Sequence, residues 1–121
     1  MMVGVGIDLV DVERIRRALE NPRFVLRILT ERERASLPLT AERVAGRWAA
    51  KEAVAKAVGR PLRWHDVEIL GEPDGAPRAV TRPGVLAPGC TILLSITHER
   101  ETAAAVALLV APCRCQQQSM V

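Results

Sequence analysis

The sequence predicts an α+β fold in which a mostly antiparallel sheet packs against one long central helix. Three observations lead to this prediction. A β-branched run opens the chain at residues 3–10, an Ala-rich helical segment fills residues 41–58, and short strand patterns separated by turns follow from residue 66 to 110. Because these strands follow one another instead of alternating with helices, they favour antiparallel pairing over a parallel sheet of βαβ units.

The length and composition indicate a single domain. The chain has 121 residues, of which 49% are hydrophobic, enough for a core without disulfides or a structural metal. We expect residues 1–111 to form this domain, and residues 112–121, which lack apolar periodicity, to form a disordered tail. Phe24, Trp48 and Trp64 are its only aromatic residues. So few stacking platforms argue against a protein that binds single-stranded nucleic acid.

The charged residues and cysteines limit the possible partners and the compartment. The net charge is +3, and 15 of the 17 basic residues are Arg, which makes forked contacts with carboxylates and phosphates. Nucleic acid, an acidic protein or a nucleotide cofactor each fits this surplus. An odd number of cysteines without framework spacing predicts a reduced, intracellular protein. With no signal peptide or membrane-spanning run, we expect a cytoplasmic protein that does not bind membranes.

The first half of the chain predicts one strand and three short helices. Residues 3–10 form the strand, and Asp11 caps a helix that ends at Leu19. Asn-Pro breaks this helix, and residues 23–29 form a second one. Thr30 opens a Thr-Glu-Arg-Glu run with the spacing of a capping box, which begins a third helix.

The second half predicts the longest helix and four strands. Thr40 caps the helix over residues 41–58, and Gly59 ends it. The alternating apolar patterns that follow indicate strands at 66–70, 78–81, 91–97 and 103–110. A Pro-Asp-Gly turn joins the first two strands, and residues 98–101 join the last two.

Three charged residues stand where a core pattern does not require them. Asp8 ends an apolar strand, and a carboxylate there needs a partner if it is buried. Glu52 and Lys56 are spaced i and i+4 on the long helix, so they share one face. Taken alone, Asp8 could instead be the cap of the helix that follows. Glu52 and Lys56 could instead be a surface ion pair that stabilises the helix by about 0.2–0.5 kcal/mol. Asp8 with Glu52 is also a plausible Mg²⁺ pair, because that ion takes few carboxylates, waters and substrate phosphates.

His98 follows Ser-Ile-Thr at the end of a strand. A lone His is commonly a satisfied structural group, whereas beside a phosphate it supplies a hydrogen bond or a positive charge. Other catalytic motifs are absent from the sequence. Gly4-x-Gly6 lacks the third glycine of a dinucleotide loop, and there is no Walker loop, zinc-ligand spacing or nucleophile elbow.

Four ordered motifs resemble the 4′-phosphopantetheinyl transferase superfamily, and most closely its short bacterial branch. They cover residues 2 to about 110 in order. The motifs are Gly-Val-Gly-Ile-Asp-Leu-Val at 4–10, Arg-Trp-Ala-Ala-Lys-Glu-Ala-x-x-Lys at 47–56, Trp-x-Asp-Val-Glu-Ile at 64–69, and Leu-Ser-Ile-Thr-His-Glu at 94–99. The resemblance implies the superfamily fold and the transfer of phosphopantetheine from coenzyme A to a serine of apo-acyl carrier protein, for fatty acid biosynthesis.

The resemblance also implies roles for individual residues. Asp8 and Glu52 match the family's Mg²⁺ ligands, with the ion acting as a Lewis acid on the coenzyme A pyrophosphate. Glu52, or a water on the metal, takes the proton of the attacking serine, and Lys56 neutralises or protonates the leaving adenosine 3′,5′-bisphosphate. The positions that resemble nucleotide-phosphate contacts are Arg47, Lys56, Thr97 and His98.

Partners follow from the same resemblance. The acyl carrier protein is strongly acidic and meets the first helices of the enzyme, where the candidate contacts are Arg14, Arg17, Arg23, Phe24 and Arg27. Short family members are homotrimers with active sites between subunits, so the same assembly is implied here. One departure is the loop after the long helix, which in relatives is longer and Gly-rich but here is Gly-Arg-Pro-Leu-Arg at residues 59–63.

Three other functions remain open from the sequence. A non-catalytic basic module would bind nucleic acid or acidic proteins without needing Asp8 and Glu52. A different Mg²⁺-dependent enzyme would release ADP from coenzyme A without a carrier protein. A degenerate scaffold would keep the trimer but lose activity through the shortened loop.

Overall fold

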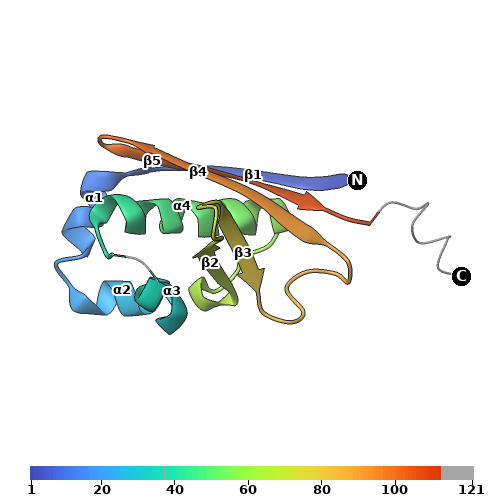
Figure 1. Cartoon of the computed structure of the whole chain (residues 1–121), viewed down its shortest axis with the longest axis horizontal. Coiled ribbons are helices and arrows are strands. Elements are labelled where there is room, and N and C mark those ends of the chain that lie inside the picture. Colours follow the sequence, from blue (N-terminus) through green and yellow to red (C-terminus); the bar gives the residue numbers. More distant parts are fainter. Residues whose placement is uncertain (37, 113–121) are drawn as a thin grey trace, which may run out of the picture.

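The computed structural model describes residues 1–36 and 38–112 and has three layers (Figure 1). The long helix α4 (Ala41–Val58) lies between a sheet on one side and a mixed layer of short helices and a hairpin on the other. The remaining elements are β1 (Met2–Asp11), α1 (Val12–Ala18), α2 (Pro22–Ile28), α3 (Glu31–Ser36), the 3₁₀ helix η1 (Trp64–Asp66), β2 (Val67–Gly71), β3 (Pro77–Thr81), β4 (Thr91–Glu99) and β5 (Thr102–Val110). The α+β prediction is confirmed.

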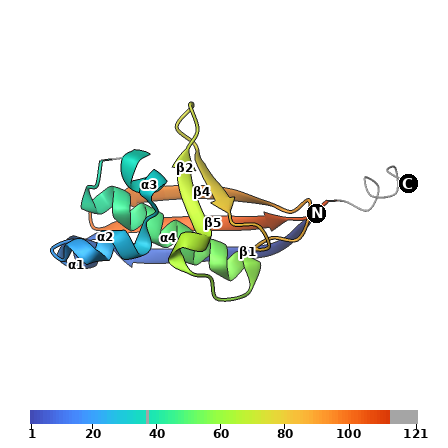
Figure 2. The same cartoon turned by 90° about the horizontal axis from the view of Figure 1, so that it is seen from below.

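The strands form two antiparallel sheets rather than one. The larger sheet has the order β1-β5-β4, and β2 pairs with β3 in a separate hairpin that projects from the molecule (Figure 2). The predicted strands are all found, with limits that differ by one or two residues, and two of these differences concern residues singled out from the sequence. Asp66 belongs to η1, where its carboxylate accepts a hydrogen bond from the backbone N–H of Arg63 at 2.9 Å. His98, predicted to lie in a connection, lies within β4.

The capping residues predicted from the sequence hold the ends of the helices. Asp11 accepts from the N–H of Glu13, Thr40 accepts from the N–H of Arg43, and Gly59 ends α4 with φ 88°. Thr30 and Glu33 form a reciprocal capping box at α3, with distances of 2.9 and 3.3 Å. Because Asp11 is the cap of α1, Asp8 is left for another role.

Small residues allow α4 to lie close to the sheet. The helix buries eight alanines and valines, and β5 adds Ala103, Ala105 and Ala107. A Cβ on Gly4 would lie 2.1 Å from the carbonyl oxygen of Ala57, and one on Gly6 would lie 1.9 Å from that of Ala53. Glycine at these two positions therefore sets the distance between β1 and α4.

A buried ion pair joins α4 to the layer on its other side. Lys51 Nζ donates to Glu33 Oε1 at 2.7 Å, to the carbonyl of Ile28 at 2.6 Å and to that of Trp64 at 2.7 Å. Glu33 Oε2 accepts from the backbone N–H of Ile69 at the open edge of β2, at 2.9 Å. Burial lowers the pKa of Lys51, while the Glu33 carboxylate opposes that shift. Through these hydrogen bonds the ion pair connects α4 to α2, α3, η1 and β2.

The predictions about the C-terminal tail, the cysteines and membrane spans can be compared with the structure only in part. The predicted tail falls almost wholly on residues 113–121, which lie outside the described residues, as do Cys113 and Cys115. Within the described part, Cys90 forms no disulfide, and no helix is long and apolar enough to cross a membrane.

Candidate active site

The first part of the site lies where β1 crosses α4. Gly4, Gly6, Asp8 and Val10 alternate along β1 and face the helix, because successive side chains of a strand point to opposite sides. Gly6 lies against the turn of α4 that holds Ala53. Asp8, two residues further along β1, therefore reaches the helix about one turn earlier. Its Oδ1 lies 3.2 Å from Lys56 Nζ, which also donates to the carbonyl of Ile7 at 2.9 Å.

Glu52 shares the Lys56 face of α4 but does not pair with it. The two residues are one turn apart, yet Lys56 reaches across to Asp8, and no ion pair to Glu52 forms within residues 1–36 and 38–112. Glu52 is half-buried, and no ion pair within the described chain neutralises its carboxylate. The surface-pair interpretation of Glu52 and Lys56 is therefore wrong. The pair observed on this face is Asp8 with Lys56, and Glu52 lies one helical turn from Lys56.

The donor set fits a cation that brings its own further ligands. No group of three or more His, Cys, Asp or Glu side chains converges within the described residues, so a closed protein cage for a metal is not found there. Asp8 and Glu52 are two partly buried carboxylates, of which Glu52 has no ion-pair partner in the described chain. Mg²⁺ suits this arrangement, because it binds through one or two carboxylates and fills its octahedron with waters and phosphate oxygens.

A second group of predicted residues surrounds a hollow of about 450 Å³ at the β4 edge of the sheet. Arg47 and His98 line it with Arg43, and the rim includes Thr40, Glu42, Gly75, Pro77 and Ile96. Burial lowers the pKa of Arg47, and its Nε is buried without a hydrogen-bond partner in the described structure. A half-buried guanidinium with an unused donor is suited to a phosphate that enters the hollow. Sequence reasoning missed Arg43, although its i, i+4 spacing from Arg47 was visible.

Thr97 is not part of this hollow. It stands between Ile96 and His98 on β4, and because strand side chains alternate, it lies on the opposite face of the sheet. The predicted phosphate contacts therefore do not all converge within one chain.

The two groups also lie on different sides of the molecule. Asp8 is on β1 and His98 on β4, with β5 between them. Arg47 and Glu52 are five residues apart on α4, which corresponds to about 140° around the helix axis. A phosphate held by Arg47 and a cation held by Glu52 cannot belong to one small site of a single chain.

The predicted partner contacts gather on α1 and α2. Arg17, Arg23, Phe24 and Arg27 line a hollow of about 700 Å³ together with Ala18, Glu20 and Asn21. Arg14 lies just outside it, with its guanidinium carbon 5.6 Å from the ring centre of Trp48. These residues, predicted from sequence alone, form one basic surface with an aromatic residue in it, called the α1–α2 surface below.

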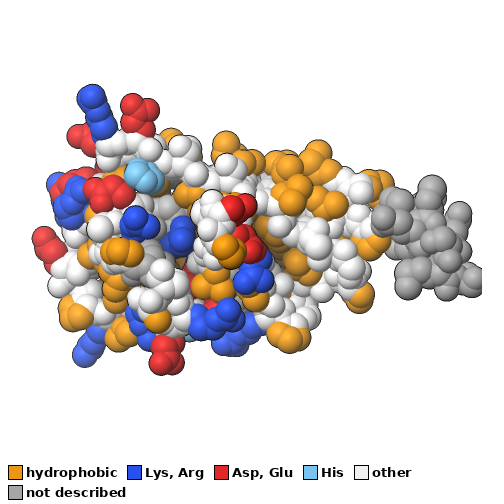
Figure 3. Space-filling view, in the orientation of Figure 1, with side chains coloured by type: hydrophobic (Ala, Val, Ile, Leu, Met, Phe, Trp, Pro, Cys, Tyr) orange, Lys and Arg blue, Asp and Glu red, His pale blue; other side chains and the backbone are white. Residues whose placement is uncertain are grey.

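The outer face of the larger sheet is apolar, which the sequence analysis did not anticipate. Val3, Val5, Ile7 and Leu9 of β1 point away from α4 and are 52% to 71% exposed. The register aligns Val5 with Leu108 of β5 and Leu93 of β4, so the apolar side chains continue across all three strands. Figure 3 shows hydrophobic side chains gathered over the sheet side of the molecule. The period-2 pattern of residues 3–9 was visible, but its unburied face required the structure.

Comparison with known proteins adds independent evidence. Residues 4–107 match the family model described as the 4′-phosphopantetheinyl transferase superfamily. The holo-[acyl-carrier-protein] synthase of Listeria welshimeri is 44% identical over 119 residues, covering 90% of this chain and 98% of its own length. That of Geobacillus kaustophilus is 48% identical over 115 residues, covering 87% of this chain and 86% of its own.

Solved structures show the same fold. A holo-(acyl-carrier-protein) synthase from Bacillus anthracis, in complex with CoA (3′,5′-ADP), superposes with a TM-score of 0.80 at 37% identity, covering 93% of this chain and 99% of its own. A holo-[acyl-carrier-protein] synthase from Helicobacter pylori, in complex with coenzyme A, gives a TM-score of 0.80 at 25% identity, covering 88% and 99%.

Proposed function

The chain belongs to the 4′-phosphopantetheinyl transferase superfamily, among its holo-[acyl-carrier-protein] synthases, and from that premise we propose how its residues carry out the reaction. The enzyme transfers 4′-phosphopantetheine from coenzyme A to acyl carrier protein, a step that serves fatty acid synthesis. The observation that carries the residue assignment is the contact of Asp8 with Lys56 where β1 crosses α4, with the unpaired Glu52 one turn from Lys56 on the same helix face.

Asp8 and Glu52 are proposed to hold Mg²⁺. The half-buried, unpaired carboxylate of Glu52 and the strand-borne carboxylate of Asp8 support this assignment. The ion would supply positive charge that neutralises and polarises the pyrophosphate of coenzyme A. Lys56 then has two uses, since it holds Asp8 in place and offers its ammonium group to the departing phosphate.

Glu52 is also placed to act as the base. In the proposed reaction the serine hydroxyl of the carrier attacks the β-phosphate of coenzyme A, and the oxygen–phosphorus bond to adenosine 3′,5′-bisphosphate breaks. The Glu52 carboxylate accepts the serine proton. Because phosphoryl transfer depends mainly on positioning and charge neutralisation, holding these groups on rigid elements is the main contribution of the fold.

The hollow at the β4 edge is proposed to bind the remaining phosphate of the nucleotide. The buried, unused Nε of Arg47 and the neighbouring Arg43 and His98 support this role. Thr97, on the other face of β4, joins the nucleotide only if another subunit approaches that face.

A homotrimer is proposed as the active assembly. One chain carries the Asp8–Glu52 pair at one edge of its sheet and the Arg47–His98 hollow at the other, so a complete site requires a second copy. The exposed row of Val3, Val5, Ile7 and Leu9 supplies the apolar surface for that contact. Repeating one such heterologous contact around a threefold axis closes a ring with three equal sites. We place this assembly in the cytoplasm.

The α1–α2 surface is proposed to dock the carrier protein. Arg14, Arg17, Arg23 and Arg27 offer positive charge to an acidic partner, and Phe24 offers an apolar contact. Charges at the rim of an interface act mainly on the association rate, so docking should weaken as salt rises.

The experiment is intact-mass spectrometry of apo-acyl carrier protein incubated with the enzyme, coenzyme A and Mg²⁺. We expect the carrier to gain one phosphopantetheine group, and to gain none with a chelator or with Asp8→Asn. Asp11→Asn is the matched control, because this neighbouring carboxylate of β1 caps a helix instead. Full activity of Asp8→Asn would refute the metal assignment without affecting the family assignment.

The assembly is tested separately by light scattering. We expect a trimer for the native chain and a monomer for Ile7→Glu, with transfer activity lost along with the trimer. The Ile7 side chain is 67% exposed and points away from α4, so the substitution should disturb the contact between subunits and not the fold of one chain. An active monomer would refute a site shared between subunits.

A further inference from the structure

A second basic hollow lies beside the α1–α2 surface. It has a volume of about 410 Å³, between α2, η1 and the end of β3. Its lining consists of Arg27, Arg63, Trp64, His65, Asp66 and Arg82. The three arginines are exposed, while Trp64, His65 and Asp66 are half-buried and form the floor. His65 Nε2 lies 3.1 Å from the carbonyl of Leu26, which fixes η1 against α2.

The positive charges of this hollow are not matched by the protein. Arg27, Arg63 and Arg82 take part in no ion pair within the described residues. The one carboxylate, Asp66, already accepts from the backbone N–H of Arg63 at 2.9 Å. The hollow therefore presents three unpaired guanidinium groups around a single engaged carboxylate, an arrangement suited to a ligand that carries several negative charges.

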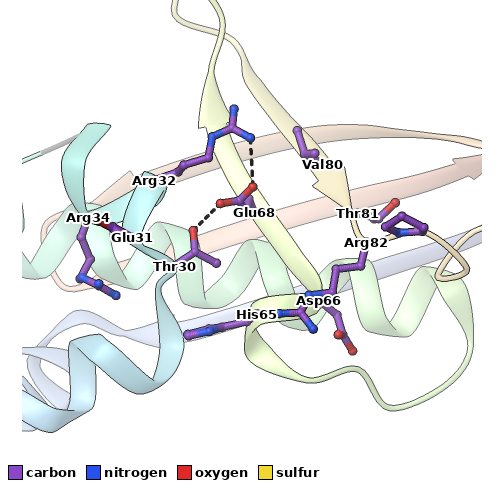
Figure 4. Close-up of a pocket in the computed structure, with 11 residues that line it drawn as sticks. Thr30, Glu31, Arg32, Arg34, His65, Asp66, Glu68, Val80, Thr81 and Arg82 are labelled. Atoms are coloured by element: carbon purple, nitrogen blue, oxygen red, sulfur yellow. Dashed lines mark hydrogen bonds and ion pairs between the residues drawn. The ribbon is translucent and has the colours of Figure 1, made fainter.

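The adjoining pocket differs in this respect. Figure 4 shows it between α3 and the β2–β3 hairpin, with Arg82 extending toward η1. There Arg32 pairs with Glu68 at 3.3 Å, Glu68 also accepts from the hydroxyl of Thr30, and Arg34 donates to the carbonyl of Leu29 at 2.7 Å. These charges are satisfied within the chain. Of the residues that line that pocket, His65, Asp66 and Arg82 also line the second hollow.

The second hollow is continuous with the α1–α2 surface. Arg27 lines both. An aromatic row runs beneath them, with ring centres of Phe24 and Trp48 5.8 Å apart and those of Trp48 and Trp64 4.4 Å apart. This row contains every aromatic residue of the chain. Glu20 and Asp66 are the only acidic residues among those that line the two hollows, so a partner that touches Phe24 and Arg27 can reach Arg63 and Arg82 over a mainly basic lining.

We propose that the carrier protein extends from the α1–α2 surface onto this hollow, and that Arg63 and Arg82 contribute to its recognition. The inference rests on the proposed docking of the carrier. The ligand chemistry is a run of carboxylates on the surface of an acidic protein, since three spaced guanidinium groups match several separate anions better than one phosphate. Arg63 and Arg82 select the carrier and do not touch the reacting atoms.

The test measures transfer to apo-acyl carrier protein with Arg63→Glu and Arg82→Glu at several salt concentrations. We expect each variant to raise the KM for the carrier about 5-fold and to weaken the salt dependence of kcat/KM, with kcat and the KM for coenzyme A unchanged. Arg100→Glu is the matched control, because this exposed arginine in the β4–β5 turn forms no ion pair within the described chain. Arg63→Gln separates charge loss from repulsion, and thermal melting verifies folding.

The outcomes separate this inference from the docking proposal. If Arg27→Glu raises the KM for the carrier while Arg63→Glu and Arg82→Glu match Arg100→Glu, the second hollow is not part of the interface and the α1–α2 surface is. If Arg27→Glu has no effect either, the docking proposal fails as well. Weaker binding of a short DNA duplex by the Arg63 and Arg82 variants, with unchanged kinetics toward the carrier, would overturn the inference in favour of a nucleic-acid surface.

Discussion

Lys51 and Glu52 are neighbours in α4, yet the helix places them in opposite surroundings. Lys51 points into the layer of short helices, where its side chain is 3% exposed and its ammonium group donates to three acceptors within 2.7 Å. Glu52 is half-buried and forms no ion pair within the described chain. A step of 100° around one helix thus separates a charge satisfied by the fold from one left available for a ligand.

Structural and functional charges in this protein differ in how completely they are paired. A buried charge needs a complete set of partners, and Lys51 has one. A charge that binds a cation or a substrate must remain incompletely satisfied until the ligand arrives. Glu52, and Arg47 with its unused Nε, meet that condition. The difference lies in the partners of each group and not in its burial alone.

The largest effect should follow from changing Glu52. Glu52→Gln keeps the shape of the side chain but removes the negative charge proposed to hold Mg²⁺ and to accept the serine proton. We expect transfer to fall at least about 1000-fold, since the charge stabilisation supplied by a metal is worth several kcal/mol. The free energy of unfolding should stay within about 0.5 kcal/mol, because no partner in the fold is lost. A variant that is destabilised but active would reverse the roles assigned to the two neighbours.

Lys51→Ala should give the opposite pattern. It leaves the Glu33 carboxylate buried without its ammonium partner, so we expect unfolding to become easier by about 3–5 kcal/mol in a denaturant titration. Lys56→Met is the matched control on the same helix, because its ion pair with Asp8 is exposed and should contribute no more than about 1 kcal/mol.

A double-mutant cycle sharpens the Lys51 prediction. Glu33→Gln combined with Lys51→Met removes both charges, so the double variant should lose less stability than the sum of the two single variants, by about 0.5–3 kcal/mol. Strict additivity would mean that the pair is not coupled, and that Lys51 acts through its two carbonyl contacts alone.

The sequence predicted the elements well because their signals are local. Asp11, Thr40 and Gly59 end helices through hydrogen bonds or backbone angles that involve nearby residues, and all three act as expected. The division of the strands into two sheets was not predicted, since it depends on pairings between distant segments. The Lys51–Glu33 pair was missed for the same reason, because its partners are 18 residues apart.

Gly6→Ala should lower both stability and transfer activity, each by an intermediate amount. The added methyl group would lie 1.9 Å from the carbonyl oxygen of Ala53 and 2.8 Å from the Cβ of Lys56, so β1 must move away from α4. We expect a loss of about 1–3 kcal/mol in unfolding free energy, together with reduced transfer, since Asp8 moves with the strand. Gly71→Ala is the control, because no atom lies within 4 Å of its added Cβ. Equal stability of the two variants would show that β1 does not depend on close contact with α4.

The site was predicted less completely than the fold. The sequence motifs identified Asp8, Glu52 and Lys56, and the structure brings Asp8 and Lys56 within 3.2 Å. It also separates Arg47 and His98 from them, which no local pattern could reveal, since the separation depends on the strand order β1-β5-β4. Arg63 and Arg82 lie 19 positions apart and meet only through η1 and the end of β3, so their shared hollow was equally inaccessible to sequence reasoning.

The smallest effect should come from Asp11→Ala, which tests the distinction between two carboxylates of one strand. Asp11 is exposed and accepts a hydrogen bond from the N–H of Glu13 at 3.0 Å, whereas Asp8 faces α4 and meets Lys56. Removing the cap should lower the unfolding free energy by about 1 kcal/mol and leave transfer unchanged. Asp8→Ala should do the reverse, abolishing transfer with little loss of stability, because an exposed ion pair is worth less than a cap. If Asp11→Ala also abolished transfer, the β1–α1 junction itself would belong to the active site, and the assignment of Asp8 as the functional carboxylate of β1 would need revision.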